Sequence, residues 1–316
     1  MNLKDHRLKP SESGHTNART NLELKDLSTA VVICTRDRHD FLRNCLKGVA
    51  NLQPLPDEVI VVDNSPGDEE TKRLALEHSA RYIKETIPGL SRARNRGMAE
   101  SSCEIIAYLD DDAVPDQRWL SFLTKPFADP QVAAVTGGIV SGESLTSAET
   151  DRVRLLSNED PKWLEIAGFG GLGIGANMAL RKAACPGSRI FDLRLGRGAV
   201  LGGGEESHAF VKLLARGYRA VHLPEAVVSH EWRPIDVDQE ASRAIAYWLL
   251  LFFEFPGHRL ELVKFLVGRL RHKPLSWYRR SPDFGLIITS GWSVRIRAAL
   301  AGIPLYLRTR RSQSAE

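Results

Sequence analysis

The stretch that decides the fold runs from Ile105 to Asp112 and reads IIAYLDDD. Its first five residues are an uninterrupted apolar run, which is typical of a strand buried on both faces of a parallel sheet. Three consecutive aspartates follow directly. Carboxylates this close together repel one another unless a cation neutralises them. The stretch therefore predicts a buried strand that ends in a cation-binding acidic turn.

Two similar apolar runs precede this strand, at Ala30–Cys34 and Glu58–Val62. Apolar residues at helical spacing follow each of them, over 41–49 and over 68–78. The order strand, helix, strand, helix, strand with continuous apolar strands is the pattern of a parallel α/β sheet. We therefore expect an α/β fold with this sheet at its centre.

The rest of the chain predicts further elements with a less regular order. Short strands are expected at Tyr82–Lys84, Val132–Val140, Gly175–Leu180, Arg219–Leu223 and Ala226–Ser229. One helix is expected to open at Gly89 with Ser91 as its N-cap, and another to span 205–216. Beyond Pro234 the pattern is helical, apolar and basic, and we expect prolines to divide it into short pieces at Pro256, Pro274, Pro282 and Pro304.

The composition excludes several classes of protein. With 316 residues, 43% hydrophobic and 26% charged, the chain resembles ordinary globular proteins, not disordered, collagen-like or coiled-coil ones. A net charge of +4 does not indicate a nucleic-acid binder. Four scattered cysteines without a CxxC pair predict neither a zinc knuckle nor a disulfide scaffold, and they favour a reducing compartment. No apolar leader is visible, so we expect a cytoplasmic chain, or one that lies peripherally on the cytoplasmic membrane face.

Polar clusters follow three of the predicted strands. They are Thr35, Arg36 and Arg38 after the first, Asp63 after the second, and Asp110, Asp111 and Asp112 after the third. Ligands of parallel sheets bind outside the carboxyl ends of the strands, so we expect these clusters to meet at one edge. Alternation in an extended chain places Asp110 and Asp112 on the same side, where both could reach Mg²⁺ or Mn²⁺ on a diphosphate. A solvated acidic turn, an Asx turn at Asp63 and a solvated basic turn remain the alternatives.

Three later motifs add charged groups. The segment GLSRARNRG at 89–97 concentrates arginines near a helix start, where phosphate is favoured, although an exposed basic face explains it as well. Glu205 and Glu206 open the predicted helix after three glycines, where a carboxylate is held ionised, as a general base requires. His230 follows a short strand and could ligate a metal. By contrast, the GxGxxG match at 168–173 follows no predicted strand, so we discount a dinucleotide site there.

Taken in order, the motifs VVICTRDR, VIVVDNSPGD, GLSRARNRG, IIAYLDDDAVP, GGGEESHAF and His230 resemble glycosyltransferase family 2 over about Ala30 to His230. The resemblance implies a GT-A-like nucleotide-binding fold, with a mixed, mainly parallel central sheet flanked by helices. It also implies a nucleoside-diphosphate sugar as donor and inversion at the anomeric carbon by a single displacement.

The resemblance also implies roles for particular residues. Asp110 and Asp112 would be the DxD pair that holds Mg²⁺ or Mn²⁺, with His230 completing the metal site. Glu206, with Glu205 beside it, would supply the general base, although Glu stands where the family has Asp. The donor would be bound by Thr35, Arg36, Arg38, Asp63, Arg94, Asn95, Asp110, Asp111 and Asn177.

These inferences give a domain plan and a function. We expect a flexible lead-in over 1–28, a GT-A-like domain over 29–235 and a C-terminal helical basic extension over 236–316. From Glu231 onward there are 14 lysines and arginines against 8 acidic residues. The expected function is glycosyl transfer to a saccharide, lipid-linked or small-molecule acceptor, in the synthesis of a cell-surface polysaccharide or glycoconjugate. A nucleotidyltransferase, or a non-catalytic nucleotide-binding or membrane-surface protein, is the alternative.

Overall fold

The computed structural model describes residues 27–65, 69–141, 144–145, 153–230, 237–271 and 292–313. The strands are β1 (Thr29–Thr35), β2 (Glu58–Asp63), β3 (Arg81–Lys84), β4 (Ile105–Asp110), β5 (Ala113–Pro115), β6 (Val132–Ser141), β7 (Ser144–Leu145), β8 (Arg154–Leu156), β9 (Asn177–Arg181) and β10 (Arg219–His230). The helices are α1 (His39–Ala50), α2 (Glu69–Glu77), α3 (Leu90–Glu100), α4 (Trp119–Thr124), α5 (Trp163–Gly168), α6 (Glu205–Ala215), α7 (Val237–Glu254), α8 (Arg259–Arg271) and α10 (Trp292–Gln313), with short 3₁₀ turns η1 (Lys125–Ala128), η2 (Lys182–Ala184), η3 (Pro186–Ser188) and η4 (Pro256–His258).

One mixed sheet organises the chain, with the strand order β3-β2-β1-β4-β9-β6-β10-β5. The first four strands run parallel, as the apolar runs predict. β9 then pairs antiparallel with both β4 and β6, and β6 and β10 are parallel to each other. Register places Thr35 beside Asp63 and Cys34 beside Asp110, so the polar clusters that follow these strands start at the same level of the sheet.

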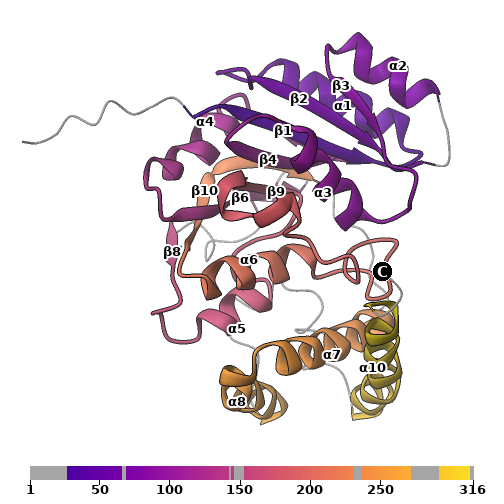
Figure 1. Cartoon of the computed structure of the whole chain (residues 1–316), viewed down its shortest axis with the longest axis vertical. Helices are drawn as coiled ribbons and strands as arrows, with labels where there is room; N and C mark the ends of the chain where they lie inside the picture. Colours follow the sequence, from indigo (N-terminus) through magenta and orange to yellow (C-terminus); the bar gives the residue numbers. More distant parts are fainter. Residues whose placement is uncertain are drawn as a thin grey trace, which may run out of the picture.

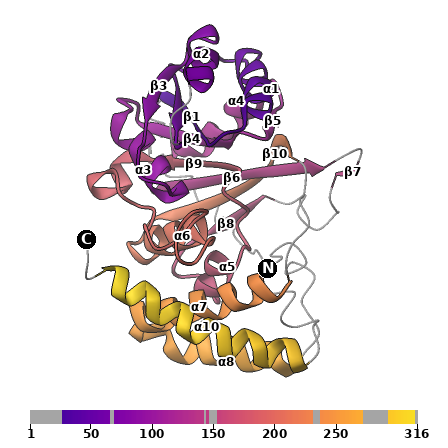
Figure 2. The ribbon, with the colours of Figure 1, turned by 90° about the vertical axis from the view of Figure 1, so that its right-hand side faces the viewer.

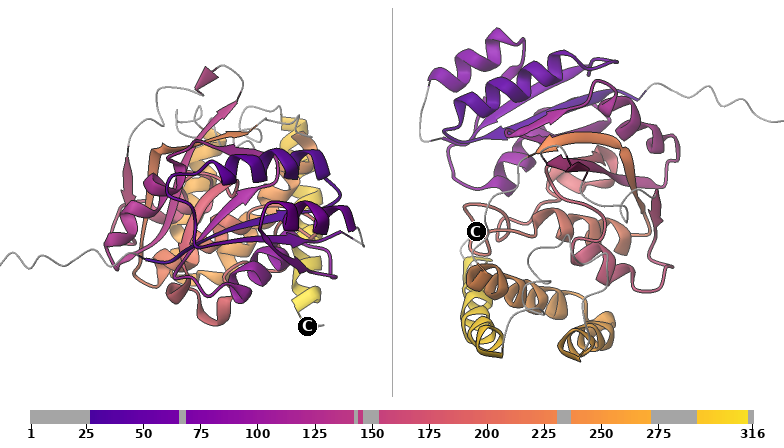
Figure 3. Two further views of the ribbon diagram at one scale, coloured as in Figure 1. Left: turned by 90° about the horizontal axis from the view of Figure 1, so that it is seen from above. Right: turned by 180° about the vertical axis from the view of Figure 1, so that it is seen from behind.

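Helices cover both faces of this sheet (Figures 1 and 3). Val31 and Ile33 of β1 point to the face packed by α1, α2 and α4, whereas Val32 points to the face packed by α3, α5 and α6. This alternation is the two-residue period of an extended strand. Both faces are therefore buried, which explains why the parallel strands read as continuous apolar runs and not as alternating ones.

The C-terminal helices form an additional layer beyond α5 and α6, on the side away from the sheet (Figures 1 and 2). Leu250 and Leu251 of α7 join the core cluster of that face, and α10 packs along α7. None of the helices in the described ranges is both long and apolar enough to cross a membrane. Residues 1–26 of the lead-in predicted over 1–28, and the predicted boundary at 235–236, lie outside the described residues.

Three local expectations are wrong. Ser91 does not cap α3: the N-cap is Gly89, and the Ser91 hydroxyl instead donates to the carbonyl of Leu195 at 2.7 Å. The two short strands expected at 219–229 are one strand, β10, with a register irregularity between Leu223 and Val228. Pro304 does not end a helix but lies inside α10, because packing against α7 holds the helix on both sides of it. Pro274 and Pro282 lie outside the described residues.

Candidate active site

The strand-end clusters meet around one cavity of about 240 Å³ at the carboxyl edge of β1 and β4. Its lining comes from the turn after β1, the start of α3, the acidic turn and the loop before α6, and comprises Cys34, Thr35, Arg36, Arg38, Asn64, Gly89, Leu90, Ala93, Asp110, Asp111, Asp112, Arg197 and Gly198. Parallel strands deliver their carboxyl ends to one edge, which is why segments more than 70 residues apart share this lining. The three clusters that the sequence analysis picked out thus lie together, with Asp63 one residue before the lining.

The acidic turn divides into an outward and an inward group. Asp110 and Asp112 lie with His230, and one ligand atom of each falls within 4.8 Å of the others. Asp111 is buried and accepts a hydrogen bond from the Thr35 hydroxyl at 2.7 Å. Arg38 bridges the turn, since its guanidinium donates to both Asp111 and Asp112. The basic turn after β1 therefore neutralises part of the acidic turn after β4.

The surroundings shift the pKa values of Asp111 and Asp112 in opposite directions. Burial raises the pKa of Asp111 to about 6, although hydrogen bonds from Thr35 and the charge of Arg38 oppose the rise. Burial acts in the same direction on Asp112, but hydrogen bonds from His230 and Arg38 outweigh it, and the pKa of Asp112 lies well below its ordinary value. The hydrogen bond to Asp112 raises the pKa of His230, against the effect of burial. Asp112 is consequently ionised at neutral pH.

Asp110, Asp112 and His230 fit a hard divalent cation. Two carboxylate oxygens and one imidazole nitrogen within 4.8 Å of one another form a donor set that Mg²⁺ or Mn²⁺ accepts, and the side of Asp110 toward the cavity leaves room for phosphate oxygens. Asp112 Oδ1 and His230 Nε2 are 3.1 Å apart. β4 ends at Asp110, and in the turn that follows Asp111 is held by Thr35 and Arg38, whereas Asp112 lies with Asp110 and His230.

Arg94 connects the acidic turn to α6. Its guanidinium is buried and donates to Glu205 Oε1 at 2.8 Å, to Asp110 Oδ1 at 3.1 Å and to the Gly175 carbonyl at 3.1 Å. Burial acts to lower the pKa of Arg94, but Asp110 and Glu205 raise it above its ordinary value. Arg94, predicted to bind the donor, therefore makes three hydrogen bonds to protein groups, and it links the start of α6 to the acidic turn.

The start of α6 presents two acids in different settings. Gly204 is the N-cap in a left-handed conformation (φ 83°) that disfavours a side chain, which explains the glycines before Glu205. Glu205 is buried against Arg94, whereas Glu206 is half-buried. Glu206 lies in the first turn of α6, where the positive end of the helix dipole favours a carboxylate.

Three residues predicted to bind the donor, Asp63, Asn95 and Asn177, make hydrogen bonds to protein groups. Asp63 is fully buried and accepts from Ser65 N–H, Tyr82 hydroxyl and Lys84 Nζ, the Asx-turn alternative. Hydrogen bonds outweigh burial and lower its pKa. Asn95 makes two hydrogen bonds to the backbone of Phe191. These side chains shape the edge from behind the cavity lining.

Asn177 likewise lies inside the protein. Its side chain is completely buried, accepts from the Trp119 indole N–H and donates to the carbonyls of Gly138 and Ala226. Its amide joins β9 to β6 and β10 at the irregularity of the β6–β10 pairing between Leu223 and Val228, where backbone carbonyls take a side-chain donor. The structure thus places Asn177, which was predicted to bind the donor, inside the sheet with its amide bonded to protein groups.

Sequence reasoning missed the contribution of the loop before α6. Arg197 and Gly198 line the cavity, and the Arg197 carbonyl accepts from Leu90 N–H at 2.9 Å, which fixes the loop to the start of α3. Asn64 was also missed: it lines the cavity and holds Gly89 N–H at 2.7 Å through its side chain. The Gly-Arg-Gly run at 196–198, an arginine between two glycines with positive φ, is the signal that could have indicated the loop.

Comparison with known proteins agrees with this geometry. The sequence model of Glycosyl transferase family 2 matches residues 30–185, which contain β1 through β9 and the acidic turn. The chain belongs to glycosyl transferase family 2. The family 2 match thus ends before α6, so the loop, α6 and His230 extend the site beyond the matched residues.

Two of the curated relatives illustrate the sequence similarity. Glycosyltransferase AglE of Haloferax volcanii is 33% identical over 119 residues, which are 35% of this chain and 38% of AglE. The succinoglycan biosynthesis protein ExoM of Rhizobium meliloti is 29% identical over 230 residues, 69% of each protein. The chain spans about a third of the length of the first curated relatives it matches, AglE among them.

The fold of family 2 is also found among solved structures. Mannosyltransferase PcManGT from Pyrobaculum calidifontis, solved in complex with GDP-Man and Mn²⁺, superposes with a TM-score of 0.57 at 19% identity, over 91% of this chain and 83% of that one. At this identity the likeness establishes the fold: a mixed, mainly parallel GT-A-like sheet with flanking helices, as the family resemblance implies.

Proposed function

We propose that this chain is a metal-dependent inverting glycosyltransferase, which moves a sugar from a nucleoside-diphosphate sugar to an acceptor hydroxyl. The observation that carries the proposal is the Arg94 bridge, which holds Asp110 of the acidic turn and Glu205 of α6 on one guanidinium group. A departing diphosphate needs positive charge, and an attacking hydroxyl needs a base. The bridge keeps groups suited to these two tasks next to each other.

On the donor side, Asp110, Asp112 and His230 would hold Mg²⁺ or Mn²⁺. The bound cation would neutralise the negative charge that the diphosphate gains as it departs. Thr35, Arg36 and Arg38 line the same cavity and offer hydrogen-bond donors to the nucleotide. Arg36 is the exposed member of the three, with 49% of its side chain accessible, so a bound phosphate would not have to displace a buried ion pair.

On the acceptor side, Glu206 is the proposed general base. Glu205 already accepts a hydrogen bond from Arg94, so we assign it to positioning the helix start. Glu206 follows it in the first turn of α6, where the helix dipole favours the ionised carboxylate. Removal of the proton from the acceptor hydroxyl lets its oxygen attack the anomeric carbon from the side opposite the departing diphosphate, which inverts the configuration.

The relatives support a biosynthetic setting. ExoM, the relative that shares the greatest length with this chain among those named above, is described as a succinoglycan biosynthesis protein. We therefore propose an acceptor that belongs to a growing cell-surface polysaccharide or glycoconjugate, and a location at the cytoplasmic face of the membrane.

The test is turnover of a panel of nucleotide sugars with the full chain and Mn²⁺, followed by addition of EDTA. We expect one donor to be hydrolysed or transferred, with release of its nucleoside diphosphate and loss of activity in EDTA. In parallel, titration with nucleoside diphosphates with and without Mn²⁺ is expected to show metal-dependent binding. Absence of both turnover and metal-dependent nucleotide binding contradicts the proposal, and release of pyrophosphate from a nucleoside triphosphate would identify a nucleotidyltransferase instead.

A further inference from the structure

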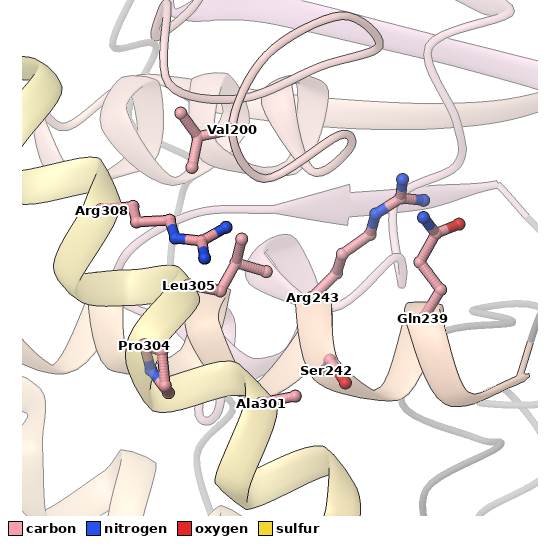
Figure 4. Close-up of a pocket in the computed structure, with 8 residues that line it drawn as sticks. All are labelled: Val200, Gln239, Ser242, Arg243, Ala301, Pro304, Leu305 and Arg308. Carbon is pink, nitrogen blue, oxygen red and sulfur yellow. The ribbon is translucent and has the colours of Figure 1, made fainter.

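A second cavity, of about 430 Å³, lies between the C-terminal helices and the loop before α6 (Figure 4). We call it the C-terminal cavity. Its lining residues are Val200 of the loop, Gln239, Ser242 and Arg243 of α7, and Ala301, Pro304, Leu305 and Arg308 of α10. It shares no lining residue with the cavity at the carboxyl edge of β1 and β4, which we call the donor-edge cavity. The site described above therefore does not account for it.

The polar groups of this cavity are cationic or neutral. Arg243 and Gln239 extend side by side from α7, and Arg308 extends from α10 toward Val200 (Figure 4). The described lining contains two guanidinium groups, one amide, one hydroxyl and no carboxylate. Guanidinium groups donate in a planar fork that matches the oxygens of a phosphate, and arginine stays charged at any physiological pH. The lining is thus suited to an anion with several oxygens.

The cavity adjoins the segment that carries the proposed base. Gly202 has φ 70°, and a Cβ placed on it would lie 2.7 Å from Arg243 Cζ, so the guanidinium packs directly on the backbone of this loop. One helical turn after Arg243, the Tyr247 ring packs in the same way against Gly204, the N-cap of α6. An occupant that contacts Arg243 would therefore lie on the α6 side of the site, which is where an acceptor must approach Glu206.

The rest of the lining is apolar and continues onto an exposed stripe of α10. Ala301, Pro304 and Leu305 form the α10 wall of the cavity. On the neighbouring stripe of the same helix, Leu300 is 69% exposed and Leu307 is 51% exposed. An apolar chain that left the cavity would lie next to this stripe, and burial of its CH₂ groups there would favour binding. The combination of a cationic pocket and an apolar stripe matches an amphiphile with an anionic head.

We propose that the C-terminal cavity binds the phosphate of the acceptor, with Arg243 and Arg308 as its ligands, and that the acceptor is a lipid-linked sugar phosphate, whose lipid chain lies along α10 and whose sugar carries the attacking hydroxyl. The inference rests on the proposed function, because it deepens the acceptor side of the same reaction. The phosphate could equally be carried by a soluble sugar phosphate, and the exposed stripe on α10 is what favours the lipid.

The experiment measures binding to the full chain by titration calorimetry, without donor, so that it does not depend on turnover. The probes share a chain or a phosphate: n-decyl phosphate, n-decyl maltoside and glucose 6-phosphate. We expect n-decyl phosphate to bind, and Arg308→Gln to weaken it about tenfold, the effect of one charge-assisted hydrogen bond. Lys264→Gln, which removes one exposed charge from α8 outside the cavity, is the matched control and is expected to leave the affinity within about twofold.

The outcomes distinguish a lipid-linked phosphate from a soluble sugar phosphate, and they test the acceptor site separately from the proposed function. Binding of glucose 6-phosphate that is as tight and as sensitive to Arg308→Gln supports the phosphate site and assigns a soluble acceptor. No binding of n-decyl phosphate, equal binding of n-decyl maltoside, or equal affinity in Arg308→Gln overturns the inference. Nucleoside diphosphate binding with Mn²⁺ is measured on the same samples. If the nucleoside diphosphate binds but n-decyl phosphate does not, the acceptor site is refuted and the proposed function stands. If n-decyl phosphate binds but the nucleoside diphosphate does not, the proposed function is refuted.

Discussion

Two clusters of similar side chains do opposite things in this molecule. The donor-edge cluster is Asp110, Asp112 and His230, and the interlock cluster is Asp192, His208 and Glu254. In each, one ligand atom from every member lies within 4.8 Å of the others. By residue type alone both would be metal sites. They differ in what already occupies the space between the acids.

In the interlock cluster an arginine fills the centre. Arg194 donates to Asp192 Oδ2 at 2.6 Å and also contacts Glu254, and His208 Nε2 donates to Glu254 Oε2 at 2.7 Å. Glu254 is the last residue of α7, so the network joins the C-terminal layer to the loop before α6. At the donor edge, Arg38 donates to Asp112 and Arg94 donates to Asp110, so each of these contacts reaches one member of the cluster, and both aspartates also line a cavity. The comparison teaches that the position of the arginine, more than the set of acids, separates a structural ion network from a candidate metal site.

The largest effect is expected from Asp112→Asn. Loss of this carboxylate removes a proposed cation ligand, and we expect kcat to fall by about 10³-fold or more, with loss of Mn²⁺-dependent nucleotide binding. The measurement is steady-state kinetics together with nucleotide titration. Asp40→Asn makes the same chemical change at a side chain that is 92% exposed, and it serves as the control. Full activity in Asp112→Asn would make the donor-edge cluster as structural as the interlock.

The second prediction tests the roles of the two acids that open α6, the helix that also contributes His208 to the interlock cluster. We expect Glu206→Gln to lower kcat roughly 10²- to 10³-fold with little change in donor KM, because only proton removal from the acceptor is lost. Glu205→Gln removes the partner of a buried guanidinium and is expected to reduce stability as well as activity. A larger kcat loss in Glu205→Gln with unchanged stability would exchange the two assignments.

A stability effect is expected at the interlock. Glu254→Gln removes the carboxylate that His208 and Arg194 share and leaves Arg194 with Asp192, and we expect the free energy of unfolding to fall by about 3 kcal/mol. Urea unfolding measures this change, and Mn²⁺-dependent nucleotide binding is expected to be retained. Glu261→Gln, in an exposed ion pair with His258, is expected to change stability by less than about 0.5 kcal/mol. Loss of nucleotide binding in Glu254→Gln would show that the two clusters are not independent.

The smallest effect concerns pH. Burial acts to raise the pKa of Asp192, but hydrogen bonds from Arg194 outweigh burial and lower this pKa from 3.8 to about 2. A depressed pKa means that the folded state favours the ionised acid, so this stabilisation is present above about pH 4 and is lost as the pH falls toward 2. Compared with wild type, Asp192→Asn is expected to be about 2 kcal/mol less stable at pH 7, and this difference should shrink below pH 4. A stability difference that stays constant from pH 7 to pH 3 contradicts the assignment.

Sequence by itself determined the parallel half of the sheet and the acidic turn. Ala30–Cys34, Glu58–Val62 and Ile105–Leu109 are strands because a continuous apolar run must be buried on both faces, and the connecting helices require these strands to be parallel. Parallel strands end at one edge, so the grouping of Thr35, Arg38 and the aspartates followed from local patterns alone.

Tertiary structure alone decided which polar side chains face the cavity and which are used inside the protein. Arg94 and Glu205 are 111 positions apart, and Asn177 meets its partners only because β9 enters the sheet antiparallel between β4 and β6. A motif specifies a residue type near a place, whereas the direction and the partners of that side chain depend on contacts with distant segments. The interlock at Glu254 and the C-terminal cavity have the same origin, since each exists only where α7 meets the loop before α6.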